Sequence, residues 1–431
     1  MELKEIQKSI EEYYENENKN ELNFFEQYED FFQNKIFILT TEAKNRLMLL
    51  KTFIELKINI LLEGPTGTAK TLSAEIICDL LEYIKQKEKE EKGEKYKKKE
   101  VIKFNLSSET TIPDLLGRYI GSNKSLAGIK MQDGPFIDAY KNGKILILDE
   151  INLASKSVLE CIEAALDNDF LSIDMPGKPL INKIPKHKDF CLIATQNPNS
   201  GLYIGKRQDL GFEFLSHFQV IYFDKFTNEE YKYMAIGLSK NFGFEETEEQ
   251  NEFIDEFVKF HLKWTEKKVD ELQCFTIREI AATLKALSNK DNKLKPYQII
   301  MIIYGARYDE KGKKELSNEL NKYKHLKNLD KSEFIIPNNF PEYFKNESIE
   351  RVIRSILFSL ENNRHVIITG KGGNGKTQLA KWIAQYWNKE RQNKKDDYFC
   401  ICTKNITCWD LIGRQKIIKD FQKKNNSFYS S

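Results

Sequence analysis

A glycine-rich stretch early in the chain has the residue types and the spacing needed to hold a phosphate group. Residues 64–71 read GPTGTAKT, which fits the pattern G-x-x-x-x-G-K-[ST] except at Ala69, where the pattern has its second glycine. In such a loop, backbone amides surround the phosphate oxygens, the lysine faces the β- and γ-phosphates, and the hydroxyl holds Mg²⁺. We therefore expect Lys70 and Thr71 to bind a nucleoside triphosphate with Mg²⁺. A methyl group at position 69 is tolerated where the local φ angle is negative, so Ala69 weakens the match without removing it.

Acidic and amide side chains that could complete such a site stand at the ends of two apolar runs. The run ILIL precedes Asp149 and Glu150, and the run within DFCLIATQNP ends at Asn197. Asp149 is placed to hold Mg²⁺, Glu150 to orient or deprotonate an attacking water, and Asn197 to position that water beside the γ-phosphate. A plain helix N-cap is the alternative for the acidic pair. It does not account for the apolar run and the glycine-rich loop together.

These side chains can meet if a parallel sheet brings the ends of its strands to one edge. Apolar segments at 58–63, 101–106, 145–148, 189–198 and 218–223 can be its strands. Helical stretches alternate with them, which predicts a parallel α/β sheet with its ligand at the strand ends. From residue 227 to about 308 the apolar spacing is helical, which predicts a helical lid. Arg278 opens one of these helices and could reach phosphate, or it could be an ordinary surface arginine.

The composition makes several partners unexpected. Lys and Arg number 67 and Asp and Glu number 65, so the net charge of +2 gives no electrostatic reason to expect nucleic acid or an anionic membrane as the main partner. No run of about 18 apolar residues is present, and the charged N-terminus lacks the apolar core of a secretory signal. We therefore expect an intracellular protein, of the nucleus or cytoplasm, that is not secreted.

The glycine-rich loop, the DE strand, the TQN strand and the helical lid, in this order, resemble the AAA+ ATPases. The resemblance is greatest to the dynein-related branch, with its midasin and MoxR-like families, and it is dense over residues 58–223. It is carried by LLEGPTGTAKT, NLSSETTIPDLLGR, ILILDEINLAS, FCLIATQNP and GKRQDLGFEFLSHF. The resemblance implies a P-loop AAA+ fold with ATP and Mg²⁺ as ligands.

The matched positions have roles in that branch. The resemblance implies that Thr71 and Asp149 hold Mg²⁺, that Glu150 and Asn197 act in catalysis, and that Arg278 is a sensor for the nucleotide. The loop residues that would contact ATP are Gly64, Pro65, Thr66, Gly67, Thr68, Ala69, Lys70, Thr71 and Leu72. Segments 121–134 and 172–188 resemble two inserted hairpins that often face substrates or neighbouring modules.

One position departs from the branch. His217, in LSHF, stands where the branch usually has an arginine that reaches into the nucleotide site of a neighbouring module. An arginine supplied in this way is worth about 10³–10⁵ in rate in related phosphate chemistry. Either Arg207 or Lys206 substitutes for it, or this module leaves its neighbour's site slow.

A second glycine-rich loop, GKGGNGKT, begins at Gly370 and repeats the first near the end of the chain. Gly370, Gly375, Lys376 and Thr377 would hold a second phosphate group, and ITCWDLIGR further on matches TTIPDLLGR. The repeat indicates the start of a second AAA+ module. Its counterparts of the acidic strand, the sensors and the lid are missing, so we expect Lys376 to lie in a loop that hydrolyses nothing in this chain.

The domain order follows from these matches, with IFILT and EFIIP as corresponding strands ahead of the two loops. We expect an N-terminal helical segment (1–35), an AAA+ large subdomain (36–225), a helical lid (226–310), a linker (311–332) and an incomplete second AAA+ module (333–431). Such a chain is a piece of a longer polypeptide or a shortened gene product. The expected partners are other AAA+ modules, of the same longer chain or of an oligomer.

The predicted function is ATP hydrolysis by a module of a midasin- or dynein-like ring that remodels a macromolecular assembly. A nucleotide-binding structural or regulatory module with little turnover is the alternative, because of His217 and the incomplete second copy. A DNA translocase or helicase is a weaker third possibility, because the charge is balanced and the sequence has no basic stripe with interleaved aromatic residues.

Overall fold

The structure is a computed structural model that describes residues 24–33, 35, 37–96, 98, 100–121, 129–173, 182–199, 207–267, 275–289, 294–327, 336, 340 and 347–390. The chain divides into two compact units, Met1–Ser332 and Glu333–Ser431. None of the described helices combines the length and the apolar character that a membrane crossing requires.

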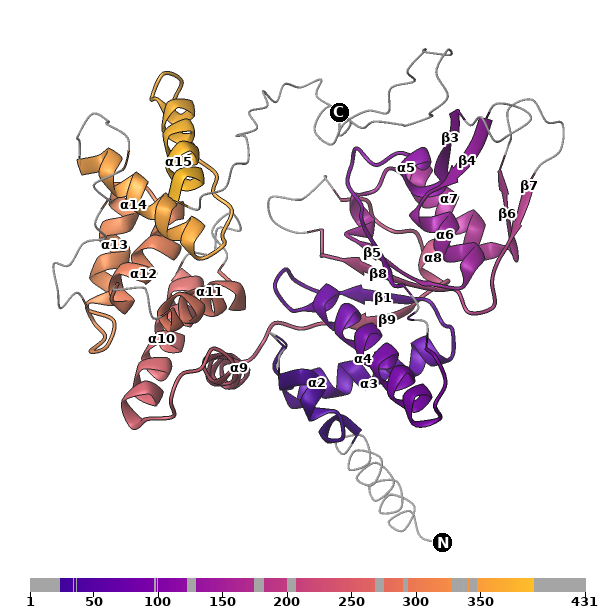
Figure 1. Cartoon of the computed structure of the whole chain (residues 1–431), viewed down its shortest axis with the longest axis horizontal. Coiled ribbons are helices and arrows are strands. Elements are labelled where there is room, and N and C mark those ends of the chain that lie inside the picture. The colour runs from indigo at the N-terminus through magenta and orange to yellow at the C-terminus, as the bar shows by residue number, and fades with distance from the viewer. Residues whose placement is uncertain are drawn as a thin grey trace, which may run out of the picture. The chain divides into compact units, whose positions relative to one another are not determined.

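A five-stranded parallel sheet forms the centre of the first unit (Figure 1), in the order β2-β5-β8-β1-β9. Its strands are β1 (Ile60–Glu63), β2 (Ile102–Asn105), β5 (Ile145–Asp149), β8 (Cys191–Gln196) and β9 (Gln219–Tyr222). The three central strands are almost continuously buried, as expected for strands covered on both faces. The predicted parallel α/β fold is therefore confirmed, and each strand lies within two residues of its predicted bounds.

Helices cover both faces of the sheet (Figure 1). Helices α3 (Thr41–Glu55) and α4 (Lys70–Glu91) cover one face, and α6 (Pro135–Asn142) and α7 (Lys156–Asp167) the other. Because successive strand residues point to opposite faces, Ile60 and Leu62 pack in the α3–α4 core whereas Leu61 packs in the α6–α7 core. Two short helices, α5 (Ile112–Leu116) and α8 (Phe212–Leu215), complete this layer.

The described part of the N-terminal segment packs on the α3–α4 side. It includes helix α2 (Glu29–Gln33), and Phe25 and Phe32 are buried in the same core. Residues 37–40, which we predicted to be a strand, belong to no strand. Instead, the Thr40 hydroxyl accepts a hydrogen bond from the Ala43 amide at 3.1 Å and caps α3. A side chain that satisfies an unpaired amide at a helix start favours the cap over a strand here.

Two antiparallel hairpins extend from the sheet. Strand β3 (Gly117–Gly121) pairs with β4 (Ile129–Asp133), and β6 (Phe170–Ile173) pairs with β7 (Asn182–Pro185). These correspond to the two hairpins that we expected at 121–134 and 172–188. Their turns, at 122–128 and 174–181, lie outside the described residues.

The helical region after the sheet contains α9 (Asn228–Asn241), α10 (Glu248–Lys267), α11 (Ile277–Ser288), α12 (Pro296–Ile303) and the short turn η4 (Gly305–Arg307). Its core is largely aromatic, with Trp264 and Tyr304 fully buried and the rings of Phe275 and Tyr304 stacked 4.7 Å apart. Residues 311–320, which we expected to belong to a linker, instead form helix α13 (Glu310–Leu320). Leu316 and Leu320, one helical turn apart, are fully buried and fix this helix to the lid.

The described part of the second unit consists of α14 (Glu347–Glu361), a glycine-rich loop and α15 (Lys376–Glu390). Ile353 and Leu357 of α14 share a small core with Leu379 and Ile383 of α15. Ile367, in the extended segment before the loop, is 89% exposed. The segment ITCWDLIGR, which matches TTIPDLLGR of the first module, lies outside the described residues.

Candidate active site

The first glycine-rich loop connects β1 to α4 and closes around its own lysine. Lys70 Nζ donates hydrogen bonds to Gly64 O at 2.7 Å, to Pro65 O at 2.8 Å and to Asn197 Oδ1 at 2.8 Å. The Thr68 hydroxyl donates to Pro65 O at 2.9 Å. Burial lowers the pKa of Lys70 to about 8, although the neighbouring carboxylates of Glu150 and Asp149 act in the opposite direction. The ammonium group thus sits at the end of α4, inside the loop that would receive phosphate.

Ala69 adopts a conformation that we did not expect. Its φ angle is +65°, in the left-handed region, whereas we had judged a methyl group tolerable there only at negative φ. For a residue with a side chain this conformation costs about 1–2 kcal/mol. The loop shape therefore requires what glycine would provide, and Ala69 occupies the position at a cost in stability.

Asp149 lies directly beside the hydroxyl that follows Lys70. The Thr71 hydroxyl donates to Asp149 Oδ1 at 2.8 Å, and the same carboxylate oxygen accepts a short hydrogen bond from the Thr195 hydroxyl. Thr195 also accepts from the Glu150 amide at 3.1 Å, so this fully buried threonine links the two acidic residues. Nothing in the sequence pattern singled out Thr195, although it lies in the same TQN stretch as Asn197.

This pair of oxygens fits Mg²⁺. Hard divalent cations prefer oxygen ligands and usually combine one or two protein groups with substrate phosphates and water. Thr71 and Asp149 supply a hydroxyl and a carboxylate at the mouth of the phosphate loop. Two protein oxygens of this kind suit a site whose other ligands are phosphate oxygens and water. Among the described residues, no group of three or more His, Cys, Asp or Glu side chains could hold a metal.

Glu150 lies at the end of β5 in a strained conformation, with a φ angle of +58°. Its Oε1 atom accepts a short hydrogen bond from Asn197 Nδ2, so Asn197 bridges Glu150 and Lys70 through the two ends of one amide. Burial raises the pKa of the Glu150 carboxyl, and the Arg207 guanidinium counteracts this effect. Strained residues of this kind cluster at functional sites, where the surrounding contacts hold them in place.

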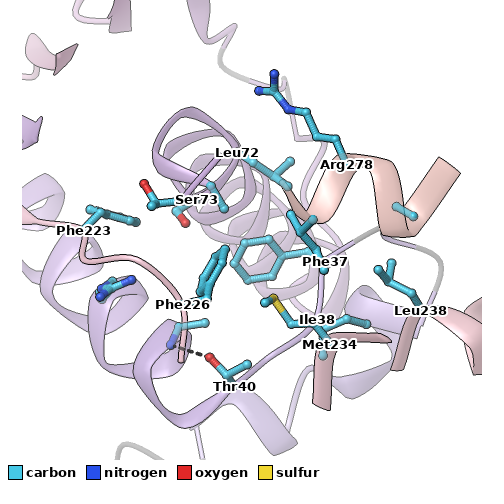
Figure 2. Close-up of a pocket in the computed structure, with 16 residues that line it drawn as sticks. Phe37, Ile38, Thr40, Leu72, Ser73, Phe223, Phe226, Met234, Leu238 and Arg278 are labelled. Carbon is cyan, nitrogen blue, oxygen red and sulfur yellow. Dashed lines mark hydrogen bonds between the residues drawn. The ribbon is translucent and has the colours of Figure 1, made fainter. Parts of the chain in front are cut away.

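An apolar cavity of about 150 Å³ adjoins the phosphate loop. Its walls come from the segment before α3, the loop, the end of β9 and the lid, and Figure 2 shows Phe37, Leu72, Phe226 and Met234 around it. The cavity suits a flat, largely apolar group attached to the phosphates. Sequence reasoning anticipated Arg278 from the lid but missed the apolar lid residues and the segment before α3. The sequence showed that the apolar segment IFILT recurs as EFIIP ahead of the second loop, but it did not show that this segment lines the cavity.

Arg278 lies at the rim of this cavity. It is the second residue of α11, its side chain is exposed, and its guanidinium group points away from the other labelled side chains (Figure 2). Thr276, which caps the helix, contacts the phosphate loop instead: a Cβ atom on Gly67 would lie 2.6 Å from Thr276 Cγ2. Gly67 has a φ angle of +87°, so both the backbone and the lid require glycine there.

Arg207, one of the two residues that could substitute for the arginine finger, and His217, which stands at the usual finger position, occupy different places. Arg207 is buried within this same site, where it donates to Pro198 O at 2.7 Å and lies 3.7 Å from Glu150 Oε2. It is therefore not placed to reach a neighbouring module. His217 Nε2 lies 3.2 Å from Asp167 Oδ1. Lys206 lies outside the described residues.

The second loop repeats the backbone of the first. Lys376 Nζ donates to Gly370 O at 2.9 Å and to Lys371 O at 2.6 Å, as Lys70 does to Gly64 and Pro65. Gly375, the counterpart of Ala69, has a φ angle of +69°. Thr377 follows on α15. In the described part of the second unit, no amide or acidic side chain joins Lys376 as Asn197 joins Lys70.

The structure thus brings together Lys70, Thr71, Asp149, Glu150 and Asn197, with Gly64, Pro65, Gly67, Thr68 and Ala69 forming the loop around them. Thr66 is exposed at the tip of the loop, and Leu72 lines the cavity. Arg278 lies at the rim of the cavity, and its guanidinium group points away from the other labelled side chains (Figure 2).

Comparison with known proteins gives a consistent result. Residues 59–218 match the family model of the AAA domain of the dynein-related subfamily. Midasin of Dictyostelium discoideum is 24% identical over 427 residues, which cover 91% of this chain and 6% of that protein. Midasin of Giardia intestinalis is 28% identical over 198 residues, 46% of this chain and 4% of that protein. The chain thus corresponds to a small part of these relatives.

Two further matches are shorter or more distant. An uncharacterized protein of Staphylococcus aureus (strain USA300) is 33% identical over 119 residues, 27% of this chain and 39% of that protein. The crystal structure of NtrX from Brucella abortus in complex with ADP aligns with a TM-score of 0.39 and 13% identity, over 64% of this chain and 57% of that chain. Residues 59–218 are therefore similar to the AAA domain of the dynein-related subfamily, and the chain is similar to a small part of two midasins.

Proposed function

We propose that the first unit binds ATP with Mg²⁺ and hydrolyses it at the cluster formed by the phosphate loop and the ends of β5 and β8. One observation carries the proposal: the loop and the strand ends are joined by two 2.8 Å contacts, from Lys70 Nζ to Asn197 Oδ1 and from Thr71 Oγ1 to Asp149 Oδ1. A cation and a hydroxyl suited to phosphate and metal therefore stand beside the acids suited to metal and water.

The residues of the cluster would have separate roles in binding phosphate, holding Mg²⁺ and activating water. Lys70 would exchange its bonds to the Gly64 and Pro65 carbonyls for bonds to phosphate oxygens. Mg²⁺, held by Thr71 and Asp149, would neutralise charge on the phosphates. Glu150 would take a proton from the attacking water, and Asn197, hydrogen-bonded to it, would keep its carboxylate oriented.

The wider setting is a ring of several AAA+ modules. Two facts support this: the matched midasins are far longer than this chain, and a second phosphate loop follows the first in the same chain. We propose that its partners are other AAA+ modules, of the same longer chain or of an oligomer. The work performed would be remodelling of a macromolecular assembly in the nucleus or cytoplasm, and we do not propose nucleic acid as a partner.

A nucleotide-binding module with little turnover is the second candidate function. The observation that favours it is the His217–Asp167 pair, which occupies the position where an arginine would serve a neighbour. A ring with such an interface would use this module for support or regulation.

Phosphate release by the 431-residue chain, measured with ATP and Mg²⁺ over a range of protein concentrations, tests the two candidates. For the ATPase we expect turnover that EDTA abolishes and that Glu150→Gln reduces strongly. Binding of ATP at the same affinity in wild type and Glu150→Gln, with equally negligible phosphate release in both, would favour the second candidate instead.

A further inference from the structure

Arg207 has an unusually buried environment for an arginine. Its side chain is 6% exposed, its Nη1 atom donates to Pro198 O at 2.7 Å, and its Nη2 atom lies 3.7 Å from Glu150 Oε2. That carboxylate oxygen is itself buried and accepts no hydrogen bond, while Oε1 is held by Asn197. The Glu150 side chain as a whole is 32% exposed, but separating its buried oxygen from the buried Arg207 cation would still be costly, because the cation would remain uncompensated.

The backbone around Arg207 is held in place independently of that pair. Asn152, in the turn η1 (Ile151–Leu153) that follows Glu150, is almost fully buried. Its Nδ2 atom donates to Asn197 O at 2.8 Å, and its own carbonyl accepts from the Gln208 amide at 2.6 Å. The Asn152 side chain therefore joins the end of β8 to the turn after β5. The backbone carbonyl of Asn152 holds Gln208, the residue next to Arg207, in place.

We propose that Arg207 is a positioning residue that acts within its own module, holding the Glu150 carboxylate in the orientation in which Glu150 serves the attacking water. Asn197 restrains one oxygen of the carboxylate and Arg207 faces the other. The two groups together fix a side chain whose backbone is already in a strained conformation. This inference rests on the proposed function of Glu150 and reverses the role that we considered for Arg207 from the sequence, which was to serve a neighbouring module.

Kinetics of Arg207→Met and Arg207→Lys in the full chain form the first test. Misplacing a catalytic group by about 1 Å costs on the order of 10²-fold in rate, so Arg207→Met should lower kcat by about that factor and leave the affinity for ATP nearly unchanged. Arg207→Lys should restore part of the rate, because it returns the charge without the forked geometry. An unchanged kcat in Arg207→Met would overturn the proposal.

Lys144→Met is the matched control. Lys144 is also largely buried, at 19% exposure, and is paired with Asp138 and Glu100 at 2.9 Å, but it precedes β5 at the end of the strand remote from Glu150. Lys144→Met should lose both ion pairs without losing kcat. A loss of kcat equal to that of Arg207→Met would assign the Arg207 effect to general destabilisation and overturn the proposal.

A mixture of two variants distinguishes whether Arg207 acts within its own module or on a neighbouring one. In an equimolar mixture of Glu150→Gln and Arg207→Met chains, each Arg207→Met site keeps its own Glu150 and could receive Arg207 only from another chain. We expect the mixture to show the mean rate of the two separate variants. A rate clearly above that mean would show that Arg207 acts in trans.

A spectroscopic test does not depend on turnover. In the nucleotide-free chain labelled with ¹⁵N-arginine, the Nε–Hε resonance of Arg207 can be identified by its loss in Arg207→Lys. Glu150→Gln should shift this resonance, because it removes the charge opposite the guanidinium. An unmoved resonance would overturn the inference. If the chain binds ATP without hydrolysing it, the proposed function is overturned. The shift of the Arg207 resonance in Glu150→Gln would then still test whether Arg207 contacts Glu150.

Discussion

Lys70 and Asn197 are joined by a hydrogen bond of 2.8 Å across 127 residues of sequence, and the other end of the same amide is bonded to Glu150. The group that would face the phosphates and the group that would face the water are therefore connected through one side chain. Lys376 in the second loop has only carbonyl partners in the described part of its unit. We therefore predict that the two loops differ in function.

Lys70→Ala should weaken ATP binding at least about tenfold, or about 1.4 kcal/mol, and abolish turnover, because it removes the cation that faces the phosphates. Lys376→Ala, which removes the matching lysine of the second loop, should leave turnover unchanged. Fluorescent-nucleotide binding and phosphate release on the two full-length variants provide the measurement. Equal losses in both would mean that the second loop is a working site.

Glu150→Gln should keep ATP bound while lowering turnover by about 10²–10⁴-fold, the range typical of a lost general base. Glutamine has nearly the same shape and can still accept the hydrogen bond from Asn197 Nδ2, so the cluster should stay in place. Single-turnover hydrolysis alongside equilibrium binding measures both effects. Near-normal turnover would move the role of base to another residue.

Ala69→Gly should stabilise the chain by about 1 kcal/mol, because glycine adopts a φ angle of +65° without the clash that a methyl group meets. Ala74→Gly, further along α4 in ordinary helical conformation, is the control and should destabilise by about 1 kcal/mol. Urea unfolding of both variants compares them. Destabilisation by Ala69→Gly would contradict the left-handed conformation at this position.

His217→Arg should raise ATP turnover at protein concentrations where chains associate, if a neighbour lacks an arginine finger at this position. Asp167 lies 3.2 Å from the His217 ring and would pair with an arginine placed there. The double variant His217→Arg/Asp167→Asn should therefore give the larger increase. ATP turnover at the wild-type level in both variants, at all concentrations, would show that position 217 does not supply an arginine finger to a neighbouring chain.

His261 should make the stability of the lid depend on pH. It is buried in the aromatic core, where its Nδ1 atom contacts Tyr304 Oη at 2.8 Å and its Nε2 atom has no hydrogen-bond partner. Burial lowers the pKa of His261 to about 3. Because this folded-state pKa lies below the unfolded value near 6.5, the unfolded chain binds a proton that the folded chain does not. The contribution of His261 is thus fully present above pH 6.5 and is lost as the pH falls from 6.5 toward 3, by about 1.4 kcal/mol per pH unit.

Calorimetric unfolding of wild type and His261→Phe between pH 7.5 and 5 measures this effect. The phenylalanine variant should lose less stability on acidification than the wild type, whatever its absolute stability. Identical pH dependence in the two chains would show that another group titrates.

Much of the fold could be read from the sequence because its pattern is local. Continuous apolar runs gave β1, β5 and β8, and the residues that end them or follow them gave the acidic pair and Asn197. Other features depend on contacts between segments that are far apart in the sequence. The bond from Asn152 to Asn197 O, and the contact of Arg207 with Glu150, arise only when separate segments meet at the strand ends.

The conformation of Ala69 marks another limit of the sequence. The motif has glycine at this position because the backbone there needs a positive φ angle. An alanine can mean either that the φ angle is negative or that the chain tolerates the free-energy cost of a positive one. The structure shows the second case. Likewise, helical periodicity continued past residue 310, but the charged surface of α13 concealed the buried leucines that fix it to the lid.

The contact between Gly67 and Thr276 links two parts of the molecule that are usually considered separately. Thr276 begins α11, and its methyl group rests against the phosphate loop so closely that even one added carbon on Gly67 would collide with it. Any outward movement of the loop when Lys70 releases its carbonyls would therefore press on the first turn of a lid helix. This contact gives the phosphate loop and the lid helix α11 a direct mechanical connection, through which a displacement of one would be felt by the other.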